Sequence, residues 1–78
     1  LVKVNSWLNA LDINSENLVA IADDQGFVRI ISLATGKIVE EHKISATGIN
    51  AIIFTDDQTV LAADAGGMIY QGRLAGPN

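Results

Sequence analysis

The sequence predicts an all-β fold made of two repeated units, each a meander of four short antiparallel strands. The chain has 78 residues, 49% of them hydrophobic and 18% charged, which is too apolar for a disordered segment. Its apolar residues come in runs of about four to eight that are rich in Ile and Val, and Asp, Asn and Gly stand between the runs. No helical spacing of apolar residues persists over about ten positions. Strands joined by tight turns account for this pattern.

The repeat becomes visible when the chain is shifted by 41 residues, so that Asn9 aligns with Asn50. The alignment continues without a gap to the pair formed by Lys37 and Asn78, and eight of its 29 pairs are identical. Average composition predicts roughly two identities by chance. The identical pairs are Asn9/Asn50, Ala10/Ala51, Val19/Val60, Ala22/Ala63, Asp23/Asp64, Gly26/Gly67, Leu33/Leu74 and Ala34/Ala75.

Four apolar runs follow one another in the first unit. They span residues 8–13, 18–22, 27–33 and 38–44, with turn residues in the gaps. Residues 27–31 and 49–54 are apolar on both faces, which predicts strands covered by other layers on both sides. Residues 37–44 carry several charges, which favours an outer edge strand because charge discourages stray pairing there.

A four-stranded unit that repeats about every 40–45 residues is typical of a β-propeller blade. Residues 28–37 resemble the end of a WD-repeat blade with its Thr-Gly turn, and residues 49–62 resemble the start of the next blade. The resemblance covers almost the whole chain. The Trp-Asp pair that names the family is replaced by Ile31-Ser32 and by Gly72-Arg73. Quinoprotein-type propellers share the Thr-Gly-Lys turn and are the second family candidate.

The resemblance divides the chain into two blades that are out of phase with its ends, as in propellers closed by a shared blade. Residues 1–4 are expected to end an outermost strand, residues 5–44 to form the first blade, and residues 45–78 to form a second blade without its outermost strand. Two blades cannot close a ring, since propellers have roughly four to eight. The missing partners are therefore other blades, either the rest of a longer chain or identical copies joined head to tail. About three or four copies would give six or eight blades.

Composition narrows the classes of function. The net charge is −4 and the five basic residues are scattered, which argues against a nucleic-acid partner. No apolar run reaches the roughly 20 residues of a membrane helix, so no membrane partner is expected. Without cysteine there is neither a disulfide nor a thiolate metal site, and the single histidine, His42, has no catalytic neighbours in the sequence. We expect no catalytic residue, no metal and no cofactor.

The acidic pairs and the glycines have simpler explanations than ligand binding. Asp23-Asp24 and Asp56-Asp57 lack the spaced oxygens that calcium requires, so both pairs are predicted to be solvated turns. The glycines are predicted to serve turns rather than a phosphate loop, because no helix is expected after any of them.

Trp7 is the strongest candidate for a binding residue. It lies in a connection between an outermost and an innermost strand, and its counterpart Gly48 shows that the repeat does not require it. Trp is enriched in binding hot spots, although packing over a neighbouring blade is the alternative. The resemblance implies a scaffold that binds a protein or peptide at its rim; the alternative is a quinoprotein-like enzyme or cofactor domain whose site lies on other blades or copies. The rim candidates are Trp7, Asn5, Ser6, Asp24, Gln25, Thr47 and Gly66.

Overall fold

The computed structural model describes residues 1–75, which form seven strands and no helix. The first four strands are β1 (Leu8–Ile13), β2 (Leu18–Asp23), β3 (Phe27–Ser32) and β4 (Ile38–Lys43). The last three are β5 (Ile49–Asp56), β6 (Thr59–Asp64) and β7 (Ile69–Arg73). The all-β prediction is confirmed, and the four strands of the first unit differ from the predicted runs by at most one residue at their ends. β5 extends two residues beyond the predicted 49–54.

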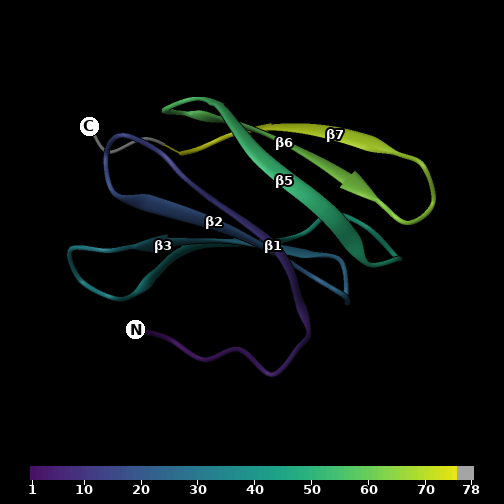
Figure 1. Cartoon of the computed structure of the whole chain (residues 1–78), viewed down its shortest axis with the longest axis horizontal. Coiled ribbons are helices and arrows are strands. Elements are labelled where there is room, and N and C mark those ends of the chain that lie inside the picture. Colours follow the sequence, from purple (N-terminus) through teal and green to yellow (C-terminus); the bar gives the residue numbers. More distant parts are fainter. Residues whose placement is uncertain (76–78) are drawn as a thin grey trace.

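The strands form two antiparallel sheets in chain order, β1-β2-β3-β4 and β5-β6-β7. Figure 1 shows the two sheets lying one against the other, with β1 and β5 running side by side where they meet. β4 is an edge strand, as its charges predicted. The second blade was expected to lack its outermost strand, and residues 76–78, where that strand would begin, lie outside the described residues.

The internal repeat extends to the strand register. β1 pairs with β2 so that Leu8 faces Asp23, and the register then shifts before Ala10. β5 pairs with β6 so that Ile49 faces Asp64, and the register shifts before Ala51. An irregularity at the same place in both sheets puts Asn9 and its counterpart Asn50 in equivalent backbone positions.

The main core lies between the two sheets. Strand side chains alternate between faces, so every second residue of β2, β3, β5 and β6 points into this layer. The buried members are Ala20, Ala22, Val28, Ile30, Ile49, Ile52, Val60, Ala62 and Leu74. Burial of this aliphatic layer is the main force that holds the sheets together.

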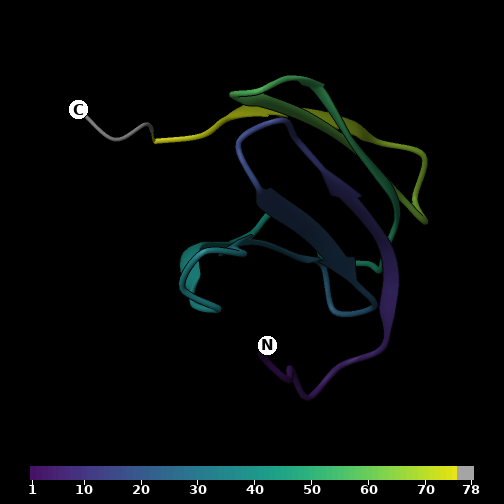
Figure 2. The ribbon, with the colours of Figure 1, turned by 60° about the vertical axis from the view of Figure 1, so that its left-hand side comes forward.

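A smaller cluster lies on the opposite face of the four-stranded sheet. Val19, Ile21 and Ile31 are buried there, and Val2 and Val4 from the N-terminal segment pack against them. Figure 2 shows this segment running below the sheet before it turns up into β1. Residues 1–4 form no strand, and they still shield part of an apolar face.

Burial differs from the expectation in two strands. β1 is largely exposed, and Leu11 keeps 68% of its surface accessible. β5 was expected to be covered on both faces, but only Ile49 and Ile52 are buried while Ile53 is 50% exposed. The reason is that residues 1–75 form no third sheet against the outer side of either sheet. Among residues 1–75 there is no helix that could cross a membrane.

Candidate functional site: the rim at one end of the sheets

The connections and turns at one end of the two sheets form a single rim. In antiparallel meanders the odd-numbered strands begin where the even-numbered ones end, so these segments gather on the right-hand side of Figure 1. They are residues 5–7, 24–26, 44–48 and 65–68. All seven residues that the sequence nominated for the rim belong to these segments.

An open groove surrounds Trp7 on this rim. Asn5, Ser6 and Trp7 line one side, and Asp24 and Gln25 of the β2–β3 turn line the other. The Asp24 N–H donates to the Trp7 carbonyl at 2.9 Å, which fixes the connection against the turn. The Trp7 side chain is 80% exposed, so it does not pack over either sheet of this chain.

The two sheets approach each other closely at Gly26 and Gly48. The Gly26 carbonyl accepts hydrogen bonds from the N–H groups of Ile44 and Ser45, at 2.9 and 3.3 Å. A Cβ atom on Gly26 would lie 2.0 Å from the Ser45 carbonyl oxygen, and one on Gly48 would lie 2.8 Å from a carboxylate oxygen of Asp24. Glycine is therefore required at Gly26 both for space and for its φ of +90°.

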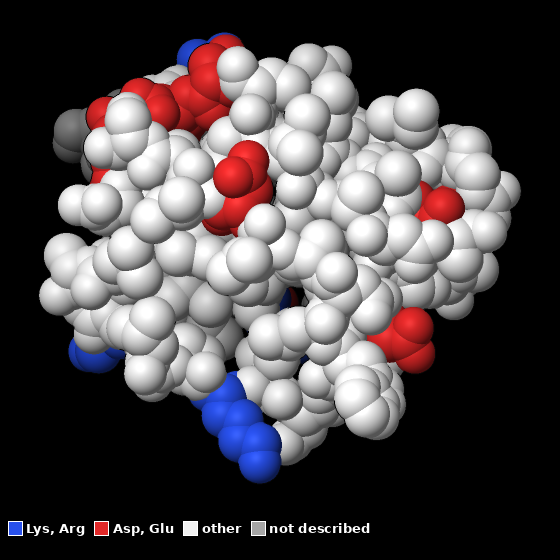
Figure 3. Space-filling view, viewed as in Figure 1, with Lys and Arg blue, Asp and Glu red and all other residues white. Residues whose placement is uncertain are grey.

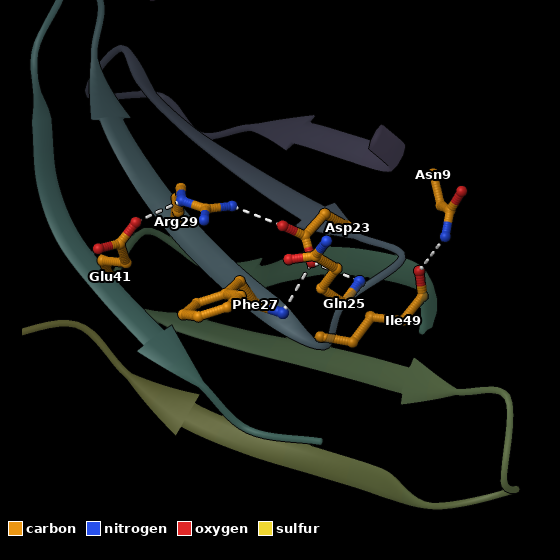
Figure 4. Close-up of polar contacts among 7 residues, drawn as sticks. All are labelled: Asn9, Asp23, Gln25, Phe27, Arg29, Glu41 and Ile49. Carbon is orange, nitrogen blue, oxygen red and sulfur yellow. Dashed lines mark hydrogen bonds and ion pairs between the residues drawn. The ribbon is translucent and has the colours of Figure 1, made fainter. Parts of the chain in front are cut away.

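Asp23 anchors the turn that carries Asp24 and Gln25, as Figure 4 shows. One carboxylate oxygen accepts from the N–H groups of Gln25 and Phe27, both at 2.9 Å. The other oxygen lies 2.6 Å from the Arg29 guanidinium, which also binds Glu41 of β4. The prediction of a solvated turn is wrong for Asp23, whose side chain is fully buried. Its partners lie on β3 and in the turn, and together they replace the water that a buried carboxylate loses.

Asp64 holds the equivalent place in the second sheet. One oxygen accepts from the N–H groups of Gly66 and Met68 at 2.9 Å, repeating the bonds of Asp23. The other accepts from the hydroxyls of Ser45 at 2.7 Å and Tyr70 at 2.8 Å. Tyr70 is the 41-residue counterpart of Arg29, so the two units share the carboxylate and change its partner. The Ser45 bond also ties the connection between the sheets to the β6–β7 turn.

Both carboxyls have lowered pKa values. The Ser45 hydroxyl and the Met68 N–H, helped by Tyr70 and Gly66, lower the pKa of Asp64 from 3.8 to about 2. Burial by itself would raise the pKa of Asp23, but the N–H bonds and the Arg29 guanidinium outweigh it and lower this pKa as well. Both groups are therefore charged in the fold at neutral pH.

We expect the protein to lose stability as the pH falls from about 4 to 2. The unfolded chain takes up a proton at Asp64 near its ordinary pKa of 3.8, whereas the folded chain takes it up near 2. A lowered folded-state pKa stabilises the fold above 3.8, and this contribution disappears as the pH falls through 2. Urea midpoints measured at several pH values should show this slope.

The variant Tyr70→Phe tests the assignment, because it removes one hydroxyl that lowers the pKa of Asp64 and keeps the ring. Its urea midpoint should depend less steeply on pH in this interval than that of the wild type. An unchanged slope in Tyr70→Phe and also in Asp64→Asn would contradict the role given to this carboxylate.

The other acidic residues and the histidine lie at the surface. Asp24 and Asp56 are exposed, while Asp57 accepts hydrogen bonds from Ser15 of the β1–β2 turn. The His42 side chain is 58% exposed, and its Nε2 lies 3.0 Å from a carboxylate oxygen of Glu40. Within residues 1–75, no three acidic or histidine side chains come close enough together to hold a metal ion.

The face shown in Figure 3 is mostly uncharged. The largest group of acidic atoms lies at its upper left, over the end where the β1–β2 and β5–β6 turns lie, and smaller ones lie at the centre and on the right. The rim groove contains Lys3 and Asp24, one charge of each sign. Its chemistry is therefore close to neutral.

Sequence reasoning missed the networks around Asp23 and Asp64. The signal was present, because Asp23/Asp64 and Gly26/Gly67 are identical pairs three residues apart within each unit. An Asp that precedes a positive-φ Gly in a tight turn can accept the N–H groups of that turn. The bonds to Arg29 and Ser45 depend on how the strands lie and leave no comparable mark in the sequence.

Comparison with known proteins supports the fold and no particular activity. No protein-family model matches the sequence, and no curated protein matches it. Among solved structures, the chain is similar to the crystal structure of the computationally designed Ika4 protein, with a TM-score of 0.85 and 22% identity. The match covers 95% of this chain and 45% of that one, so this chain spans less than half the length of the designed protein. At this identity the likeness shows the fold, an all-β chain of two antiparallel sheets packed face to face.

Proposed function

We propose that the two sheets are blades of a β-propeller of the WD-repeat type, and that the chain is a non-catalytic scaffold that binds a protein or peptide at its rim. The 41-residue repeat, the shared register shift at Asn9 and Asn50, and the face-to-face packing of the two sheets support the blade arrangement. No observation within residues 1–75 favours the cofactor-binding alternative, and it is not proposed.

The exposed Trp7 carries the proposal for binding. A Trp side chain that is 80% exposed keeps a large apolar surface in water, and that surface is available to a partner. The Ser6 hydroxyl beside it is buried and has no hydrogen-bond partner among the described residues. An apolar ring, an unpaired hydroxyl and the polar groups of Asp24 and Gln25 line one groove. An extended peptide that offers an apolar side chain and backbone carbonyls has the matching chemistry.

The substitution Trp7→Ala should leave folding intact and abolish rim binding. An exposed side chain contributes little to stability, so the free energy of unfolding should change by less than about 0.5 kcal/mol. Peptides selected from a random display library on the wild type should bind the variant at least about 30-fold more weakly, as for a hot-spot residue of about 2 kcal/mol. Trp7 is the single Trp of the chain, so its fluorescence reports on the groove directly.

Val39→Ala is the matched control. Val39 is 52% exposed on β4 and lies toward the opposite end of the sheets, so its removal should leave peptide affinity unchanged. If Trp7→Ala instead unfolds the protein, the Trp7 side chain serves the stability of the fold rather than binding. Equal peptide affinity of the wild type and Trp7→Ala would contradict the proposed binding site.

A further inference from the structure

Each sheet has an apolar outer face that residues 1–75 cover at most in part. Val2 and Val4 pack against the four-stranded sheet on this side, while Leu11 and Ile13 beside them stay exposed. The four-strand face consists of Leu11, Ile13, Val19, Ile21 and Ile31, which strand pairing places on the same side of the β1–β4 sheet. The three-strand face consists of Ala51, Ile53, Leu61, Ala63 and Ile69, placed together by the pairing of β5, β6 and β7. Both faces look away from the core between the sheets, because alternate strand residues point to opposite sides.

Several large side chains on these faces are in contact with water. Leu11 and Ile13 of the four-strand face are 68% and 52% exposed. Ile53 and Ile69 of the three-strand face are 50% and 71% exposed. Contiguous apolar surface of this kind is a hallmark of an interaction site. The internal repeat identifies what each face is built to contact.

The three-strand face is the counterpart of a surface that is buried inside the chain. A shift of 41 residues relates Ala51, Ala63 and Ile69 to Ala10, Ala22 and Val28. Ala22 and Val28 are buried in the core between the sheets, and Ala10 packs against it. The three-strand face therefore corresponds to the side of the first sheet that packs on the second.

The four-strand face is the counterpart of the other half of the same contact. The shift relates Leu11, Ile13, Val19 and Ile21 to Ile52, Phe54, Val60 and Ala62 in that order. These residues form the side of the second sheet that packs on the first. The two uncovered faces are thus the two complementary halves of an interface that the chain already buries once.

A groove on the four-strand face shows which part of that interface is missing. Leu1, Val2 and Val4 of the N-terminal segment line one part of this groove. Its sheet side includes Val19, Ile21, Ile31 and Leu33, the counterparts of Val60, Ala62, Gly72 and Leu74, which line a groove between the two sheets. Across that groove between the sheets lie Val28 and Ile30 of β3. Their counterparts are Ile69 and Gln71, which the chain cannot bring to its own four-strand face. A second copy can supply both.

One polar contact of the interface can repeat as well. The Asn9 side chain donates to the Ile49 carbonyl across the two sheets at 3.0 Å. Asn50, its identical counterpart, is exposed and occupies the same register shift, so it can donate to Leu8 of a second copy. Leu8 pairs with Asp23 as Ile49 pairs with Asp64. The backbone carbonyls of Leu8 and Ile49 therefore occupy equivalent positions in the two sheets.

The charged position at Asp12 also fits. Asp12 accepts from the Phe54 N–H across the sheets at 2.8 Å, but the counterpart of Asp12 is the apolar Ile53. The counterpart of Phe54 is Ile13, whose N–H already bonds to the Asp12 carboxylate of its own chain at 2.9 Å. Replacing the charge by Ile53 therefore leaves no donor unpaired at the second contact.

We propose that the chain associates head to tail with copies of itself, the three-strand face of one copy packing on the four-strand face of the next. The inference rests on the proposed function, since it takes the two sheets as blades. A head-to-tail contact closes into a ring when its rotation permits. With roughly four to eight blades in a ring, the assembly would hold about two to four copies.

The test uses substitutions that block one face each. Leu11→Arg places a charge on the four-strand face and Ile69→Arg places one on the three-strand face. Leu11 is 68% exposed and Ile69 is 71% exposed within a single chain, so an arginine at either position should not prevent folding. Circular dichroism checks that both variants fold. Val39→Arg, at an exposed β4 position outside both faces, is the control.

Sedimentation should give one closed oligomer for the wild type and for Val39→Arg, and monomers for Leu11→Arg and Ile69→Arg alone. An equimolar mixture of the two blocked variants should form a one-to-one heterodimer, because each variant retains the face that the other has lost. A monomeric wild type overturns the proposal, and so does a mixture that stays monomeric while the wild type assembles.

The outcomes also separate this inference from the function on which it rests. A monomeric chain that still loses peptide binding on Trp7→Ala overturns self-assembly and retains the rim scaffold. A ring in which the wild type and Trp7→Ala bind peptides equally overturns the rim site and retains self-assembly.

Discussion

Gly26→Ala is expected to destabilise the protein more than any other single methyl addition. The new Cβ would lie 2.0 Å from the Ser45 carbonyl oxygen and 2.9 Å from that of Thr47, both of them backbone atoms. The clash can be relieved only by moving the turn away from the connection between the sheets, which breaks the bonds of Ile44 and Ser45 to Gly26. Together with a left-handed φ for alanine, the loss should reach about 3–5 kcal/mol. Urea denaturation followed by circular dichroism measures it.

The chain contains a matched control for this substitution. Gly67 is the counterpart of Gly26 and has the same φ of +90°, but a Cβ on Gly67 would meet nothing within 4 Å. Gly67→Ala should therefore show the conformational cost alone, about 1–2 kcal/mol. The difference between the two variants isolates the contact with Ser45. Equal losses of stability in the two variants would mean that the contact of residue 26 with the Ser45 carbonyl contributes nothing to the effect.

Replacement of Asp23 by alanine is expected to have the second largest effect. The substitution removes the acceptor of the Gln25 and Phe27 N–H groups and leaves the Arg29 guanidinium with Glu41 alone. Removing one partner of a buried ion pair costs about 3–5 kcal/mol, and Glu41, which is half-exposed, compensates only part of the Arg29 charge. The Arg29 side chain is only 12% exposed, so water cannot fully replace the lost carboxylate. Chemical denaturation at neutral pH gives the loss.

Asp24→Asn serves as the control for that measurement. Asp24 is the next residue along the chain and is exposed, so neutralising it should change stability by less than about 0.5 kcal/mol. The double variant Asp23→Ala/Arg29→Met should recover part of the loss, since it removes the unpaired charge together with its partner. Without any recovery, the ion pair would not be the source of the effect.

The sequence predicted the strands well because their signals are local. Runs such as residues 18–22 alternate with turn residues, and a strand needs only its own apolar pattern and a turn at each end to be recognised. The pairing into meanders also followed, since short connections leave neighbouring strands little choice of partner. The charges of β4 are also a local signal, and they predicted its place at an edge.

The sequence located the rim, but it did not predict the polar contacts that hold the rim turns in place. Trp7 and Gln25 were placed at the same end because antiparallel topology brings alternate connections together. The burial of Asp23 was missed, because an Asp pair in a turn carries no sign of the Arg that will neutralise one member. Arg29 is six residues away and reaches Asp23 across paired strands, a contact that depends on which face each side chain takes.

The sequence by itself determined that the chain consists of two related units of short strands, and its 41-residue period even assigned the counterpart of each residue. The tertiary structure decided which members of the counterpart pairs are buried. Asn9 and Ile49 are 40 residues apart and meet only when the sheets pack, whereas Asn50 stays exposed. Burial depends on what lies on the other side of a face, and a local pattern is the same whether or not that neighbour is present.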